Sequence, residues 1–386
     1  MNYRKALTEN ILPFWLKNAM DEENGGIFTC LDEDGMIYGK EKSVWFQGRA
    51  LWTFSKAYNV IEKDPTYLKA AKNLYEFLPK CKDSDGRMFF TVTEDGQGIQ
   101  KRRYYFSETF AAIGCAEYYR ASNDPSALRD ARYYFDTAYD CFTGARYTEP
   151  KFNPKTNQTK ALSPVMIMLS TAQTMRAIDT EYQSKYAKIA KDCLQEILDG
   201  GFLTKKALLE SVTKDGKASD TPTGRIVNPG HSMEAAWFIM AEGILTNNQR
   251  AIDAGKKIID LTLPLGWDQK HGGIIAFTDV LGKPPVQLEW DMKLWWPQCE
   301  TMIAARLAYA LFQEEKYKKL FEDLENYCQE HFIDMKHGEW YGYLHYDNTP
   351  STTLKGNIFK GPFHIPRLYM IMAILDSGAT IEKYMR

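Results

Sequence analysis

A strongly apolar helical pattern occurs six times along the 386-residue chain at a nearly constant interval, and this repeat restricts the fold more than any other feature. Segments such as GHSMEAAWFIMAEGIL and IPRLYMIMAIL are apolar on nearly all sides, which is typical of helices buried on two faces. The patterns start near Ser43, Tyr104, Pro164, Pro229, Pro297 and Pro366, at intervals of 61, 60, 65, 68 and 69 residues. Proline is favoured in the first turn of a helix, where its missing N–H is not needed. Six units therefore follow one another along the chain.

More polar amphipathic segments, such as YQSKYAKIAKDCLQEIL, lie between the apolar ones, so each unit pairs a buried helix with a surface helix. Six such pairs predict an all-α fold, an (α/α)6 barrel, with an open superhelix as the alternative. Segments rich in glycine and aromatic residues, at 25–35, 86–98, 272–283 and 338–348, predict short β-hairpins at one mouth of the barrel. No linker-like stretch interrupts the chain, so we expect one domain over residues 1–386.

Composition narrows the range of partners. The 48 basic and 50 acidic residues give a net charge of −2, which argues against nucleic acid or an anionic membrane as the main partner. No apolar run approaches the ~18 residues that a membrane span needs. The start, MNYRKALTENILPFW, lacks the apolar centre of a signal peptide, and the seven cysteines form no CxxC pair. We therefore expect a cytoplasmic protein with reduced thiols and no disulfide framework.

Two of the six histidines occupy the starts of apolar helices. His231 falls in the first turn that begins at Pro229, and His364 lies just ahead of Pro366. The partial positive charge of a helix N-terminus disfavours an imidazolium, so both rings should be neutral and able to act as general bases. The alternative is that each ring only caps or packs. Glu234, three residues after His231, would orient that ring, and Arg367 follows His364 at the same spacing.

Other candidates lie at corresponding helix starts. Glu300 falls in a first turn four residues after Trp296, where it could simply offset the helix dipole. Trp45 and Arg49 share one helical stripe, and a buried arginine needs a counter-anion, for which Glu108 is the candidate. Because all six buried helices run the same way, these ends meet at one mouth of the ring. The set suits proton transfer on a small polar molecule, with aromatic rings stacked against a sugar.

The sequence lacks the motifs of nucleotide-binding, metalloprotease and serine-hydrolase sites. The sequence contains no GxxxxGK[ST] phosphate loop, no GxGxxG, no HExxH and no GxSxG. The histidines are too scattered for a metal site, so we expect none.

The segments that carry these residues resemble the N-acylglucosamine 2-epimerase (renin-binding protein) family. They include NGGIFTCLDEDG, SVWFQGRALW, FSETF, GRIVNPGHSMEAAWF, QLEWDMKLWWPQCETMIA, GEWYGYLHYDNT and KGPFHIPR, in order over nearly the whole chain. The resemblance implies an (α/α)6 barrel that interconverts N-acetylglucosamine and N-acetylmannosamine. It also implies that His231 and His364 are the acid/base pair and that Arg49, Glu234, Glu300 and Arg367 complete the site. Pro362 stands where the family pattern predicts Cys or Asn.

The resemblance leaves several functions open. Related members act on cellobiose or isomerise mannose. A glycoside hydrolase on the same barrel would use two carboxylates instead of two histidines, and a binding protein would catalyse nothing. The expected partner is a small amino sugar. No cofactor is needed for proton transfer, although some family members bind ATP as an effector, and a homodimer is the oligomer considered.

Overall fold

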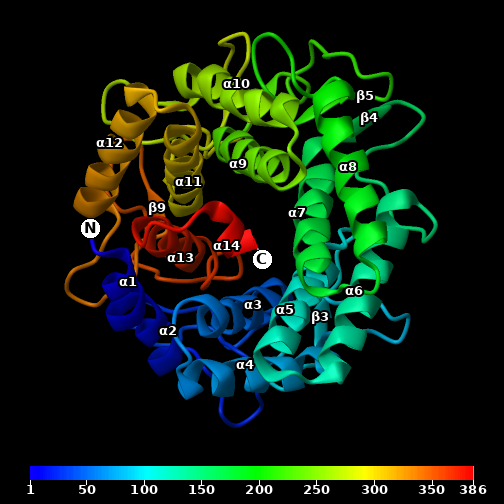
Figure 1. Ribbon diagram of the computed structural model, residues 1–386, viewed down its shortest axis with the longest axis vertical. Coiled ribbons are helices and arrows are strands. Elements are labelled where there is room, and N and C mark those ends of the chain that lie inside the picture. Colours follow the sequence, from blue (N-terminus) through cyan, green and yellow to red (C-terminus); the bar gives the residue numbers. More distant parts are fainter. Residues whose placement is uncertain (386) are drawn as a thin grey trace.

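Two concentric rings of helices make up the fold in the computed structural model, which describes residues 1–385 (Figure 1). The inner helices are α3 (Val44–Val60), α5 (Phe106–Ser122), α7 (Leu162–Ile178), α9 (Pro229–Thr246), α11 (Trp295–Phe312) and α13 (His364–Asp376). The outer helices are α4 (Pro65–Phe77), α6 (Pro125–Thr143), α8 (Gln183–Asp199), α10 (Gln249–Gly266) and α12 (Glu315–His331). A sixth outer segment comprises α1 (Tyr3–Ala6), the π-helical turn η1 (Leu7–Ile11) and α2 (Leu12–Asn18).

The first and last parts of the chain close the ring. The N-terminal segment α1–η1 packs against α13, and α13 also packs against α11 and α3. The sixth helix pair thus combines the start of the chain with its last inner helix. The predicted (α/α)6 barrel is confirmed, and the open superhelix is wrong. None of the helices among residues 1–385 is both long enough and apolar enough to span a bilayer.

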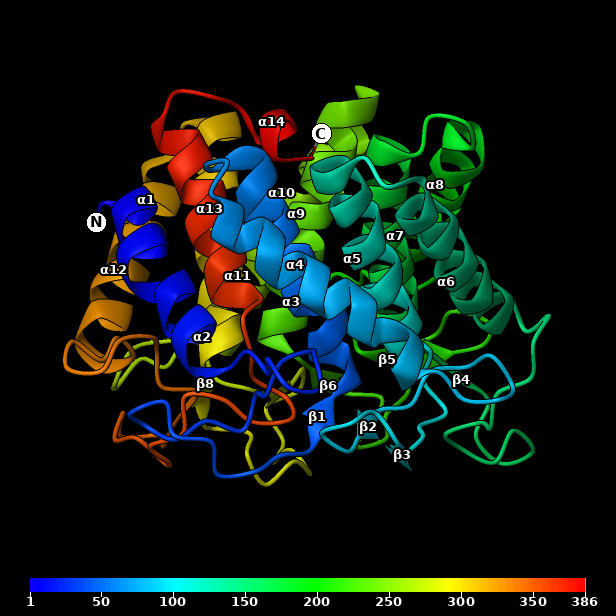
Figure 2. The same ribbon diagram turned by 90° about the horizontal axis from the view of Figure 1, so that it is seen from below.

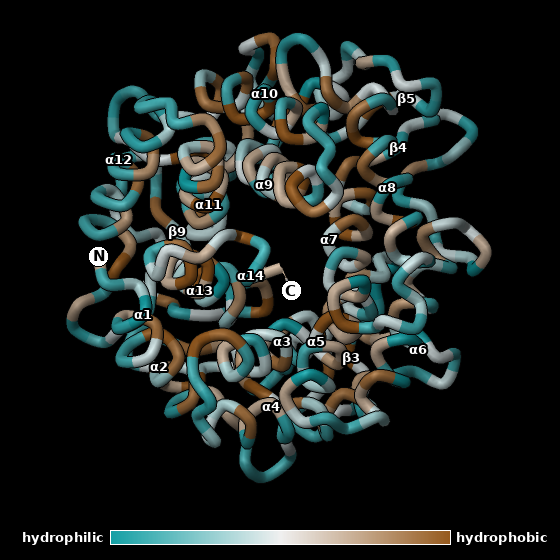
Figure 3. Tube along the Cα trace, in the orientation of Figure 1, coloured by the Kyte–Doolittle hydropathy of each residue, from teal (hydrophilic) through white to brown (hydrophobic). Residues whose placement is uncertain are grey.

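The inner helices are buried on two faces because they pack against the outer ring and line the interior. Fourteen of the 18 residues of α9 are buried, against six of the 18 in its outer partner α10. Apolar residues gather between the two helix layers, whereas the outer loops are mostly hydrophilic (Figure 3). This difference explains why the inner helices show an almost continuous apolar pattern in the sequence, while the outer ones are amphipathic.

Two glycines allow α3 and α5 to approach closely. A Cβ added at Gly48 would lie 2.5 Å from the backbone carbonyl carbon of Phe110, and one at Gly114 would lie 2.6 Å from the carbonyl oxygen of Gly48. We therefore expect Gly48→Ala to lower the free energy of unfolding by about 1–3 kcal/mol, because the helices must move apart. Denaturant titration measures the loss. At Gly39, an added Cβ would meet nothing closer than 3.3 Å, so Gly39→Ala should cost less; equal losses would contradict this account.

Short strands join successive loops at the mouth where the inner helices begin (Figure 2). The strands are β1 (Lys42–Ser43), β2 (Thr91–Val92), β3 (Gly98–Gln100), β4 (Thr159–Ala161), β5 (Ser211–Thr213), β6 (Ile226–Val227), β7 (Thr278–Asp279), β8 (Lys293–Leu294) and β9 (Tyr343–Leu344). Antiparallel pairs link β1 to β2, β2 to β3, β4 to β5, β6 to β7 and β8 to β9.

The prediction of a local hairpin in most units is therefore only partly right. In the described chain, β2 and β3 form such a hairpin, whereas segment 25–35 takes part only in single bridges. Segment 338–348 supplies β9, which pairs with β8 from the preceding unit. Segment 272–283 likewise supplies β7, which pairs with β6 from the preceding unit. Pairing between units ties neighbouring loops together, and sequence within one unit does not show it.

Buried ion pairs fix three of these mouth loops. In each, an aspartate accepts two backbone N–H groups of its own turn and binds a fully buried lysine about one loop further along. The pairs are Asp21–Lys42 at 2.6 Å, Asp268–Lys293 at 2.5 Å and Asp334–Lys355 at 2.7 Å. Removing the aspartate or the lysine of a pair would leave the other buried charge uncompensated. The pairs therefore hold these loops in place around the mouth.

Candidate active site

The rings of the two predicted histidines both lie close to one indole ring, that of Trp296, at the mouth. His231 is in the first turn of α9. Its backbone N–H donates a hydrogen bond of 3.0 Å to the side chain of Asn228, the N-cap residue of that helix. His364 is the first residue of α13. Their ring centroids lie 5.2 and 5.8 Å from the ring of Trp296. Segments 133 residues apart in sequence thus bring both imidazoles to one place.

A cavity of ≈ 320 Å³ opens beside the ring of His231, at the low end of the range for small-molecule sites, and His364, Glu300 and Trp296 are not among the residues that line it. His231, Glu234, Arg49, Arg367 and Trp45 all line it. Five residues selected from the sequence for their chemistry therefore share one chamber inside the barrel.

His231 is held by a carboxylate that the sequence analysis missed. Its Nδ1 lies 3.0 and 3.1 Å from the two carboxylate oxygens of Glu210. Glu234, which we expected to orient this ring, instead accepts a hydrogen bond from Arg367, so that prediction is wrong. Glu210 stands immediately before β5, and the pairing of β5 with β4 positions it at the mouth. Glu210 lies 21 residues before His231 and on a different element, so no helical spacing in the sequence indicates that the two residues meet.

The carboxylates around His231 reverse the expected electrostatics of its ring. Burial would lower the pKa of His231, but Glu210, together with Glu234 and Glu300, raises it above its ordinary value. We predicted that the helix N-terminus would keep this ring neutral, and the shift runs the other way. The reason is that several full negative charges outweigh the partial charge of one helix end.

His364 is neutral, as predicted, but burial and neighbouring cations are the cause rather than the helix N-terminus. Burial and the neighbouring guanidinium groups of Arg367 and Arg49 hold the pKa of His364 well below its usual range, so the ring is neutral. Its Nδ1 lies 2.8 Å from Oε1 of Glu300. An ionised carboxylate only accepts hydrogen bonds, so Nδ1 carries the proton and Nε2 keeps a free lone pair. His364 is thus prepared as a base, and His231 is favoured as the proton carrier.

Glu300 connects the groups beneath His364. It is fully buried and accepts hydrogen bonds from Trp237 Nε1 at 2.7 Å and from His364, and it forms an ion pair with Arg367 at 2.7 Å. The simpler possibility, that Glu300 only offsets a helix dipole, does not describe these contacts. Glu234, Glu300 and His364 lie close enough together to ligate a metal ion. However, Arg367 already bridges the two carboxylates as their cation, which disfavours a metal there.

Arg49 packs against aromatic rings, with its guanidinium 4.0 Å from the ring centroid of Phe110 and 4.6 Å from that of Phe363. Burial lowers the pKa of Arg49 to about 9, so the group is still charged at neutral pH. Within residues 1–385 its buried Nε has no hydrogen-bond partner. A charged donor that faces a cavity in this way is well placed to receive an anionic oxygen.

The counter-anion that we predicted for Arg49 is wrong. Glu108 is fully buried at the start of α5, where it binds Arg87 Nε and accepts the backbone N–H of Met88 at 2.9 Å. It therefore anchors the preceding loop rather than the site. Glu234 and Glu300 supply the negative charge that Arg49 experiences. The sequence correctly placed Glu108 in the first turn of α5. It could not show that Glu108 would pair with Arg87 instead of Arg49.

The family model of the N-acylglucosamine 2-epimerases matches residues 26–363 of the chain. The chain belongs to this family. The N-acylglucosamine 2-epimerase of Rattus norvegicus is 33% identical over 387 residues, which cover 97% of this chain and 91% of the relative. The cellobiose 2-epimerase of Ruminococcus albus is 28% identical over 398 residues, covering 98% of each chain.

A solved structure shows the same fold. The cellobiose 2-epimerase from Bacillus thermoamylovorans B4167 superimposes with a TM-score of 0.82 over 95% of this chain and 97% of its own, at 22% identity.

One departure from the family pattern lies next to His364. Pro362 occupies the segment that leads into α13, and its carbonyl accepts a hydrogen bond from Thr53 Oγ1 at 2.7 Å. Thr53 is buried on α3, so this bond joins the start of α13 to the neighbouring inner helix. Pro362 therefore affects the local path of the chain and adds no group to the site.

Proposed function

We propose that this member of the N-acylglucosamine 2-epimerase family interconverts N-acetylglucosamine and N-acetylmannosamine by moving a proton at C2. The observation that carries the proposal is the pair of imidazoles beside Trp296, one kept neutral and the other favoured to hold a proton. Inversion at one carbon needs a base on one face and an acid on the other. Two histidines of opposite protonation bias supply this.

The reaction follows from this arrangement. The C2 proton is acidic only when C1 is an aldehyde, so the open-chain sugar reacts. Nε2 of His364 removes the C2 proton, and negative charge develops on the C1 oxygen, where Arg49 stabilises it. His231 then delivers its proton to the opposite face of C2, and the carbonyl at C1 re-forms. The reverse reaction exchanges the roles of the two histidines, and their protons are re-equilibrated before the next turnover.

The remaining charged residues fix the pair. Glu300 holds the Nδ1 proton of His364, and Glu210 stabilises the imidazolium of His231. Both Glu234 and Glu300 bind Arg367, so neither is free to serve as the acid that a glycoside hydrolase needs. Only protons move in this scheme, so the scheme includes no cofactor. ATP as an effector and a homodimer remain predictions from the resemblance.

The test is to incubate the protein with N-acetylmannosamine, mannose or cellobiose in D₂O and to follow the products by NMR. We expect N-acetylmannosamine to give N-acetylglucosamine that carries deuterium at C2. Conversion of mannose or cellobiose alone would assign the chain to a related reaction. Release of free sugar from a glycoside would indicate a hydrolase, and the absence of any conversion would indicate a binding protein.

Replacing Glu210 should change the pH dependence of the reaction. The carboxylate favours the charged form of His231, so Glu210→Gln should lower the pKa of that ring. The limb of the kcat/KM profile that reports His231 should move to lower pH. Glu196→Gln is the control, since Glu196 is an ion-paired carboxylate on nearby α8. An unchanged profile in Glu210→Gln would show that Glu210 does not act on His231.

A further inference from the structure

The charged and apolar residues of the central cavity come from different parts of the ring. Arg49, His231, Glu234 and Arg367 belong to α3, α9 and α13. Helix α7 contributes Met166 and Ile167, together with the hydroxyl-bearing Ser163, Ser170 and Thr171. The inner helices follow one another around the barrel, so α7 lies opposite α13, the helix of His364 and Arg367 (Figure 1).

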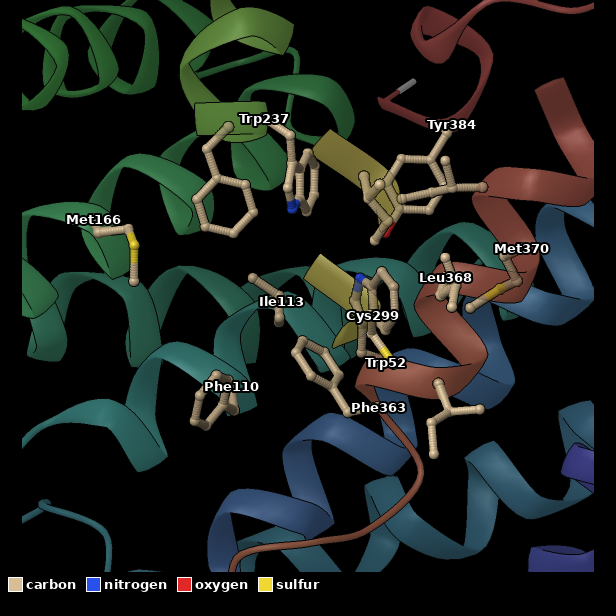
Figure 4. Close-up of a cluster of buried hydrophobic side chains, with 14 of the residues drawn as sticks. Trp52, Phe110, Ile113, Met166, Trp237, Cys299, Phe363, Leu368, Met370 and Tyr384 are labelled. Atoms are coloured by element: carbon tan, nitrogen blue, oxygen red, sulfur yellow. The ribbon is translucent and has the colours of Figure 1, made fainter. Parts of the chain in front are cut away.

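The side chains of α5 extend this apolar wall. Phe110 and Ile113 line the same cavity, and α5 packs directly against α7. Figure 4 shows Phe110, Ile113 and Met166 projecting from these two helices toward the centre of the barrel, where Phe363 also lies. No charged residue of α5 or α7 lines the cavity in the described part of the chain.

The planar intermediate of the proposed reaction has three groups on C2, which must point in three directions. The C1 oxygen faces the guanidinium of Arg49. The hydroxyl-bearing carbons from C3 onward need polar surroundings, and an outer cavity of ≈ 540 Å³ at the mouth offers Asn157, Ser211 and Lys214. Ser163 lines both cavities, so the two adjoin each other. The direction that remains for the nitrogen on C2 leads to the wall of α5 and α7.

We infer that Met166, Ile167, Ile113 and Phe110 form the subsite for the acyl group of a 2-acylamino sugar. This inference rests on the proposed function and deepens it, because it names the feature that selects the substrate class. The acyl methyl packs against the apolar side chains, and Ser163 and Ser170, one helical turn to either side of Met166 and Ile167, offer hydroxyls to the amide. A 2-hydroxyl sugar has no methyl to bury there and loses that contact.

The space beyond this wall limits the length of the acyl chain. Ile113 and Ser170 also line a deeper cavity of only ≈ 40 Å³, which continues toward Trp52 and Trp237. Tyr384 of the C-terminal helix α14 (Ile381–Met385) lines its far end. The two additional methylenes of a butanoyl chain would have to displace Met166 or enter this narrow floor, whereas an acetyl methyl ends in contact with Met166 and its apolar neighbours. We expect the protein to prefer N-acetyl over N-butanoyl sugars.

Enlarging the wall tests the inference. In Met166→Ala, the ratio of kcat/KM for N-butanoylmannosamine to that for N-acetylmannosamine should rise about tenfold or more, the usual effect of fitting extra methylenes. Met168→Ala is the matched control, because Met168 lies on the same helix, fully buried, and does not line the cavity. Its ratio should equal that of the unmodified protein. The milder Ile113→Val should raise the ratio less and decides the matter if Met166→Ala does not fold.

Two results would overturn the inference. An unchanged ratio in Met166→Ala and Ile113→Val, with N-acetylmannosamine still converted, would place the acyl group elsewhere while the proposed function stood. An equal rise in Met168→Ala would show a general loosening of α7. Failure of the unmodified protein to epimerise any N-acyl sugar would instead overturn the proposed function, and the acyl subsite with it.

Discussion

Replacing His364 or His231 with alanine is expected to lower kcat by about 10²- to 10⁴-fold, the usual scale for loss of a general acid or base. Each ring serves one face of C2, so neither can replace the other. The affinity for substrate should change far less, because both rings act on the transferring proton. Initial rates of epimerisation measured in both directions give the comparison.

A histidine outside the site provides the control for this experiment. His345 is exposed at the same mouth and does not line the central cavity, so His345→Ala should retain full turnover. Near-native kcat in either His231→Ala or His364→Ala would rule out the scheme with two histidines. Far-ultraviolet circular dichroism of each variant confirms that the barrel is intact.

The second large effect is expected for Arg49→Ala, with kcat lowered by about 10²- to 10³-fold, as for the loss of an oxyanion donor. Arg49 lines the cavity, its guanidinium packs against the rings of Phe110 and Phe363, and its buried Nε has no hydrogen-bond partner within residues 1–385. Arg49 is therefore a cleaner target than Arg367, whose removal would leave Glu234 and Glu300 buried together without their cation.

Arg49→Lys separates charge from shape at this position. An ammonium keeps the positive charge but lacks the planar group that packs against the rings of Phe110 and Phe363. We expect this variant to recover only part of the lost kcat, with KM close to that of the unmodified protein. If Arg49→Ala raised KM and left kcat unchanged, Arg49 would bind the substrate in its ground state and would not stabilise the oxyanion.

Sequence predicted the parts of the molecule that depend on local pattern. The six apolar segments gave the inner ring, because burial on two faces leaves a direct mark on composition. The prolines Pro229 and Pro366, in the first turns of α9 and α13, placed His231 and His364 at the mouth, since inner helices of one direction bring their first turns together. The position of a residue within its inner helix therefore predicts how far from the mouth it lies.

Contacts between loops could not be predicted in this way. Glu210 reaches His231 because β5 pairs with β4, and Arg87 captures Glu108 from a loop ahead of α5. Both contacts join residues on different elements whose separation matches no helical or strand period. They decide the protonation of His231 and the true surroundings of Arg49, so the electrostatics of the site became clear only from the structure.

The central claim is that two imidazoles act on opposite faces of one carbon, and exchange in the single variants tests it most directly. In D₂O, the histidine that remains can still remove the C2 proton from one face and return a deuteron to the same face. The account predicts that His231→Ala incorporates deuterium into one unconverted epimer and His364→Ala into the other. Incorporation into the same epimer by both variants, or into neither epimer by either variant, would contradict it.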